Sequence, residues 1–172
     1  MKAKVLYSSK TGNTKLIAEA IFNALPAGAE IHNIGEITSL GESGLVFFGV
    51  WIDKGTMDNA SREALPLIAT KKVALFATLG AEPDSDHAKR ALESVSVLLR
   101  EQRCEIMGTF ICQGKIDPAI IEMMKMMGQG QDNPHRMTPE REARHREAAK
   151  HPDKTDLENA VTFAKAMIAP LQ

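Results

Sequence analysis

The N-terminal residues 4–21 constrain the fold of this chain more than any other stretch. An apolar, β-rich segment at residues 4–7 ends abruptly in a polar segment, residues 9–14, that holds hydroxyls, glycine and asparagine. Apolar residues with helical spacing follow at residues 16–21. This order predicts a strand, a tight loop and a helix. Because the loop places backbone N–H groups and hydroxyls at the positive end of the helix, it predicts an anion-binding site.

The loop consists of Ser9, Lys10, Thr11, Gly12, Asn13 and Thr14. It is not a Walker loop, because GxxxxGK[ST] is absent, and it is not GxGxxG. Hydroxyls can donate to phosphate oxygens, and Gly12 permits a positive φ. The alternative is a helix cap without a ligand, since Ser, Thr and Asn are favoured at N-caps. Three hydroxyls within six residues exceed what capping requires and favour a phosphate site.

The spacing Ser9-x-Thr11-Gly12-x-Thr14 resembles the phosphate loop that follows the first strand in flavodoxins. The resemblance implies FMN as the cofactor, rather than FAD, because such a loop binds a single phosphate group that forms the end of the ligand. Lys10 is expected to face that phosphate, although free solvation suits its position nearly as well.

The composition fits one domain, residues 1–172. No apolar run approaches the roughly 18 residues that a membrane helix needs, and the N-terminus enters a strand without a signal peptide. Two cysteines make no disulfide framework, so a cytoplasmic location is expected. The net charge of −1 predicts no nucleic-acid partner, which would require a clustered basic face.

Strand-like and helix-like segments alternate along the chain. The expected strands are residues 4–7, 29–34, 45–51, 72–78 and 105–112, the last interrupted by Gly108. The expected helices among them are residues 13–25, 58–70 and 85–100. Pro66 is expected to kink or interrupt the second of these unless it lies near an end. Such alternation predicts an α/β fold with a doubly wound parallel sheet in three layers. Five strands indicate the flavodoxin-like order 2-1-3-4-5, in which the loops after strands 1, 3 and 4 open at one edge.

The segment at about residues 113–153 resembles the insertion that longer flavodoxins carry around the fifth strand. It is expected to hold a short helix at 120–127, a loop at 128–134 and a charged helix at 141–150 that follows Thr138 and Pro139. Thr155 and Glu158 are expected to form a capping box for the last helix. Three histidines at positions 135, 145 and 151 share no helical face, so no metal site is predicted.

The loop after the third strand carries Trp51, the only tryptophan of the chain. Its resemblance to the flavodoxin loop that places an aromatic on the flavin implies cofactor contacts for Val50, Trp51, Ile52, Asp53 and Gly55. The alternative is a rim tryptophan packed on its own loop. In flavodoxins the peptide after this aromatic turns its carbonyl towards the reduced flavin, which stabilises the semiquinone. The resemblance implies that the 52–53 peptide has this role here. Because the β-branched Ile52 resists a positive φ, semiquinone stabilisation is expected to be weak.

The loop after the fourth strand resembles the third flavin loop and implies backbone contacts from Thr78, Leu79 and Gly80. Many family members stack a tyrosine on the outer flavin face from this loop, but here no aromatic lies between Phe76 and Phe110. The outer face is therefore expected to be bare or covered by another segment, such as the methionine-rich insertion.

The resemblance implies a carrier that moves electrons between a reductase and an acceptor redox enzyme, as a monomer or weak dimer. An FMN-dependent NAD(P)H or quinone oxidoreductase on the same fold is the alternative. The near-neutral charge, the missing outer aromatic and the insertion keep it open, so enzyme activity is left undecided. A flavin-free regulatory module of this topology is a third class.

Overall fold

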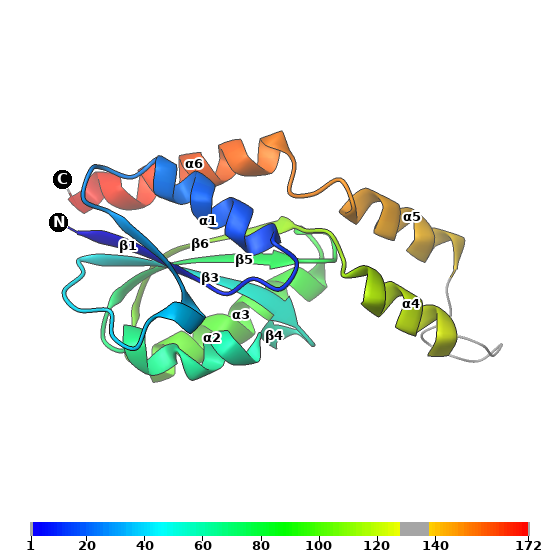
Figure 1. Ribbon diagram of the computed structural model, residues 1–172, viewed down its shortest axis with the longest axis horizontal. Coiled ribbons are helices and arrows are strands. Elements are labelled where there is room, and N and C mark those ends of the chain that lie inside the picture. The colour runs from blue at the N-terminus through cyan, green and yellow to red at the C-terminus, as the bar shows by residue number, and fades with distance from the viewer. Residues whose placement is uncertain (1, 128–137, 172) are drawn as a thin grey trace.

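The computed structural model describes residues 2–127 and 138–171 and shows a three-layer α/β fold (Figure 1). Five parallel strands form the sheet: β1 (Ala3–Tyr7), β2 (Glu30–Asn33), β3 (Leu45–Asp53), β5 (Lys72–Leu79) and β6 (Glu105–Gln113). Their order is β2-β1-β3-β5-β6, which confirms the predicted doubly wound sheet. The carboxyl ends of β1, β3 and β5 consequently meet at one edge.

Helices cover both faces of the sheet (Figure 1). Helices α1 (Asn13–Asn23) and α6 (Lys154–Ile168) lie on one face, and α2 (Asn59–Glu63) and α3 (Asp86–Glu101) lie on the other. The neighbouring residues Phe47 and Phe48 of β3 are both fully buried, and they belong to separate apolar clusters on the two faces. Side chains that alternate along a strand supply both cores, which explains why β3 is continuously apolar.

The structure adds detail to two expectations for the segment from β3 to residue 68. The strand continues to Asp53, turns through Lys54 and Gly55, and returns as the antiparallel β4 (Thr56–Met57). Both turn residues have positive φ, as a two-residue hairpin requires. The helical segment expected at 58–70 forms as α2 followed by a 3₁₀ helix, Leu65–Ile68, which confirms the interruption expected at Pro66. Pro66 lacks the N–H that a continuous α-helix would need there.

Strand β6 is continuous from Glu105 to Gln113, so the expected interruption at Gly108 is a local irregularity. Its register against β5 shifts at this point, because Ile106 pairs with Val73 and Gly108 pairs with Ala74. Shorter 3₁₀ helices occur at Ile34–Glu36 and Ala169–Leu171.

The insertion folds into α4 (Pro118–Met127) and α5 (Pro139–Ala148), which lie beyond the sheet edge in Figure 1. Thr138 caps α5 by accepting from the Arg141 N–H, with Pro139 at the first position, as predicted. The expected loop at 128–134 and His135 lie outside the described residues. No described helix is both long and apolar enough to cross a membrane.

The capping box of α6 is not the predicted pair Thr155 and Glu158. Asp153 is the N-cap residue and accepts from the Asp156 N–H at 2.9 Å, while the Asp156 carboxylate accepts from the Asp153 N–H at 2.8 Å. The helix therefore starts two residues earlier than the sequence pattern indicates.

Candidate functional site

The loop between β1 and α1 leaves the helix N-terminus open. Gly12 is the N-cap residue with a φ of 90°, and as a glycine it provides no side-chain cap for the helix. The Ser9 hydroxyl accepts from the Lys15 N–H at 3.3 Å. Because the N-cap residue is glycine, the N–H groups of Asn13 and Thr14 at the start of this eleven-residue helix have no N-cap side chain to donate to, and this arrangement suits an anion.

A pair of buried hydroxyls joins this loop to the end of β5. The Thr14 and Thr78 Oγ1 atoms lie 2.9 Å apart, and both residues are almost fully buried. The Thr14 hydroxyl thus connects two loops that the sequence analysis assigned to one site. It does not line the cavity described below.

Asp58 fixes the end of β1 from beneath the site. Its carboxylate accepts from the Ser8 hydroxyl at 2.8 Å, the Ser61 hydroxyl at 2.6 Å and the Ser61 N–H at 3.1 Å. The Asp58 N–H donates to the Trp51 carbonyl at 3.1 Å. Sequence reasoning missed this role, although the spacing Asp58-x-x-Ser61 is that of an N-cap.

A cavity of about 260 Å³ opens where these loops meet. Nine residues that the sequence analysis placed in the site line it: Lys10, Thr11, Asn13, Trp51, Ile52, Asp53, Thr78, Leu79 and Gly80. The other five predicted residues, Ser9, Gly12, Thr14, Val50 and Gly55, belong to the same loops but are not part of the lining. The structure therefore brings the three predicted loops together around one space.

Seven further residues complete the lining: Ala81, His87, Lys115, Ile116, Asp117, Ile120 and Met124. Five of these belong to the insertion, including Ile120 and Met124 of α4. Part of the wall thus comes from the methionine-rich insertion, which the sequence analysis names as a possible cover of the outer flavin face. The insertion is far along the chain from the three loops, so the sequence pattern did not predict which of its residues line the cavity.

The insertion packs tightly on two of the loops. The Asn13 side chain donates to the Lys115 carbonyl at 2.8 Å. A Cβ atom on Gly114 would lie 2.6 Å from the Asn13 Nδ2 atom, and one on Gly80 would lie 2.6 Å from the Ile116 side chain. These close approaches need glycine, and they fix the insertion against the anion-binding loop and the β5 loop.

Lys10 points across the cavity mouth. Its Nζ atom lies 3.3 Å from the Asp117 carboxylate and 5.8 Å from the centre of the Trp51 ring, within the range of a cation–π contact. The Ala119 N–H, followed by Lys10, holds the pKa of Asp117 below its ordinary value. Lys10 thus contacts the insertion here, and its expected contact with a phosphate stays a prediction.

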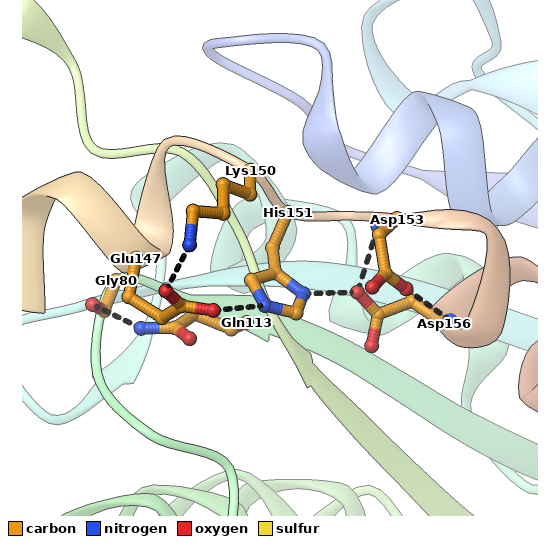
Figure 2. A network of polar contacts seen from close by, with 7 residues as sticks. All are labelled: Gly80, Gln113, Glu147, Lys150, His151, Asp153 and Asp156. Carbon is orange, nitrogen blue, oxygen red and sulfur yellow. Dashed lines mark hydrogen bonds and ion pairs between the residues drawn. The ribbon is translucent and has the colours of Figure 1, made fainter.

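The junction between α5 and α6 carries a polar network (Figure 2). His151 contacts Glu147 of α5 at 3.7 Å and the Asp156 carboxylate through its Nδ1 atom, and its backbone carbonyl accepts from the Lys115 N–H at 2.9 Å. The hydrogen bond to Asp156 raises the pKa of His151. This network fastens the insertion to the segment that borders the cavity.

Ligand atoms of His151, Asp153 and Asp156 lie within 4.8 Å of one another, a combination that sequence reasoning did not consider. The capping box and the histidine contact account for these positions as hydrogen-bond partners.

Comparison with known proteins gives the family. A family model described as a flavodoxin domain matches residues 4–165. The flavodoxin-like domain-containing protein BilS of Clostridioides difficile (strain CD3) is 36% identical over 173 residues, covering 98% of this chain and 97% of that protein. The chain therefore belongs to the flavodoxin domain family.

Solved structures agree on the fold. Oxidised Flavodoxin 1 from Bacillus cereus matches with a TM-score of 0.62 at 14% identity, covering 100% of both chains. A flavoprotein in complex with FMN from Lactobacillus acidophilus NCFM matches with a TM-score of 0.52 at 15% identity, covering 71% of this chain and 97% of that one.

Proposed function

We propose that this protein binds FMN and transfers electrons between a reductase and an acceptor redox enzyme. The observation that carries the proposal is the open N-terminus of α1, with Gly12 at positive φ, beside a cavity lined by Trp51. The Lactobacillus acidophilus flavoprotein that shares the fold holds FMN. As expected from the sequence, we place this activity in the cytoplasm and assign it to a monomer or weak dimer.

The residues present fit the two ends of FMN. Thr11, Asn13 and the first N–H groups of α1 would hold the phosphate, which is a dianion suited to a helix N-terminus. Trp51 would lie against the ring, and the backbone of Leu79 and Gly80 would meet its polar edge. FMN supplies the redox chemistry when bound, and these residues orient it and exclude water.

FMN titration into the purified apoprotein tests the proposal, with fluorescence of the single Trp51 as the signal. Saturable quenching at micromolar FMN or below is expected. Riboflavin, which has the ring without the phosphate, is expected to bind at least about a hundredfold more weakly, because charge-assisted hydrogen bonds are lost. Equal affinities for the two ligands, or no quenching at micromolar FMN, would refute the proposed site.

An FMN-dependent oxidoreductase acting on NAD(P)H or a quinone is the second candidate. The observation that favours it is the α4 wall of the cavity together with a second hollow that adjoins it on the insertion side. Incubating the FMN-loaded protein with NADH or NADPH alone separates the two functions. Steady oxidation without a second protein would identify an enzyme, whereas an electron carrier requires its reductase.

A further inference from the structure

A second cavity, of about 520 Å³, continues from the proposed cofactor cavity. The two share part of their lining, namely Gly80, Ala81, His87, Ile116 and Met124. Cavities that hold small molecules range from roughly 300 to 1,000 Å³. The second cavity therefore has the size of a small-molecule site and opens directly beside the β5 loop.

Basic groups dominate the wall that α5 provides. Arg141, Arg144 and His145 all line the second cavity from this helix. They are three and four residues apart, so they project from one helix face. Glu82 is the only carboxylate in its described lining. The wall thus combines two permanent positive charges with a histidine.

We propose that this cavity binds the carboxylate or phosphate group of a small organic molecule and holds that molecule beside the cofactor. Arginine suits both groups, since its planar fork donates two parallel hydrogen bonds to an oxyanion. The assignment of the molecule as a redox substrate rests on the proposed function. Anion binding itself does not require it.

The sequence of α5 supports a role other than core packing. Of its ten residues only Ala148, at the C-terminal end, is buried. Arg146 lies 3.8 Å from Glu142 and does not line the cavity, so it lies on another side of the helix from Arg144 and His145. A polar helix with so little buried surface is unlike a core helix.

The C-terminal end of α5 is also fixed in place. Glu147 contacts both Lys150 and His151, and His151 contacts Asp156 (Figure 2). The His151 carbonyl also accepts from the Lys115 N–H. One helical turn separates Glu147 from Arg144. The polar network therefore acts as a positioning element for the arginines, with no contact to the bound molecule.

The surroundings of His145 set its pKa. Burial, then Arg144 and Arg141, and less strongly Lys125 of α4, lower this pKa, while Glu142 opposes them. Glu82 and His87 face the same cavity from the β5 side. A bound anion would oppose the effect of the arginines, so binding should raise the pKa of His145 and strengthen as pH falls.

Calorimetric titration of the FMN-loaded protein tests the inference. Citrate, as the carboxylate probe, and pyrophosphate, as the phosphate probe, are titrated separately, so that the result shows which of the two groups the cavity binds. Arg141→Gln and Arg144→Gln should each weaken binding of the preferred probe about tenfold. Arg146→Gln is the matched control, with the same charge change on the same helix, and should change affinity less than twofold. Arg144→Lys should restore part of the loss.

Proton NMR titration of His145 provides a readout that a merely structural role would not move. The preferred probe should raise its pKa in the native sequence and not in Arg144→Gln. An equal effect of all three glutamine variants, or no binding of either probe, would overturn the inference.

Repeating the titration without FMN separates this inference from the proposed function. Probe binding that depends on Arg144, in a protein that binds no FMN, would reject the proposed function and retain the anion site. FMN binding without probe binding would reject the anion site and retain the proposed function.

Discussion

Replacing Asp58 by alanine should destabilise the protein far more than the loss of an ordinary helix cap. The cap of α2 itself contributes about 1 kcal/mol. The Ser8 and Ser61 hydroxyls, at 7% and 0% exposure, would lose the carboxylate that accepts from them at 2.8 and 2.6 Å. A buried hydroxyl left unpaired costs about 1–3 kcal/mol, so the two hydroxyls and the cap together should cost about 3–7 kcal/mol.

Urea unfolding followed by far-UV circular dichroism measures this loss. The matched control is Ser85→Ala, which removes the cap of α3, where the Ala88 N–H donates to the Ser85 hydroxyl at 3.2 Å. That variant should lose only about 1 kcal/mol. Adding Ser61→Ala to Asp58→Ala should recover part of the loss, because one orphaned hydroxyl disappears. A loss in Asp58→Ala no greater than in Ser85→Ala would refute the reasoning.

Three further predictions concern acid stability, thiol reactivity and the insertion. Lys4, at 2.9 Å, and His32 lower the pKa of Glu30 to about 2. The ionised Glu30 therefore stabilises the fold above about pH 4.5, and this contribution declines as the pH falls towards 2. In urea unfolding at a series of pH values, Glu30→Gln should reduce the dependence of stability on pH between 4.5 and 2. Burial raises the pKa of the Cys112 thiol, so it should react with an aromatic disulfide reagent at neutral pH only after denaturation, and rapid native labelling would contradict this. Gly114→Ala should weaken FMN binding about tenfold, because the new Cβ would displace Asn13. Gly35→Ala is the control: its Cβ would lie 3.7 Å from the nearest atom, so FMN affinity should not change.

The sequence predicted those features that neighbouring residues determine. Apolar runs bounded by turns located all five parallel strands, and helical spacing located α1 and α3 within two residues at each end. Alternation and right-handed crossovers left few topologies, and the five strands then favoured the flavodoxin-like order. These signals are local, and tertiary contacts reinforce them.

Features that depend on distant contacts were missed. Two capping boxes are possible at the start of α6, Thr155 with Glu158 and Asp153 with Asp156, and the second one forms. The Asp156 carboxylate also contacts His151, and the spacing of residues in the sequence does not predict this contact. The cavity wall at Lys115 bonds to Asn13 across 102 residues of sequence separation. Ser8 and Asp58 are likewise 50 residues apart. Such pairs leave no periodic or compositional trace in the chain.

The position of α4 limits how electrons can reach a flavin bound in the proposed cavity. Ile120 and Met124 close one side, and the second cavity, with its arginines, adjoins the same side. Hydride transfer requires the reacting atoms to lie about 3–3.5 Å apart, so an organic donor or acceptor would have to enter this space. Single-electron transfer between proteins requires no such entry. The Arg144→Gln variant therefore discriminates between the two functions. It should slow reaction with an anionic small molecule and leave electron exchange with a protein partner unchanged.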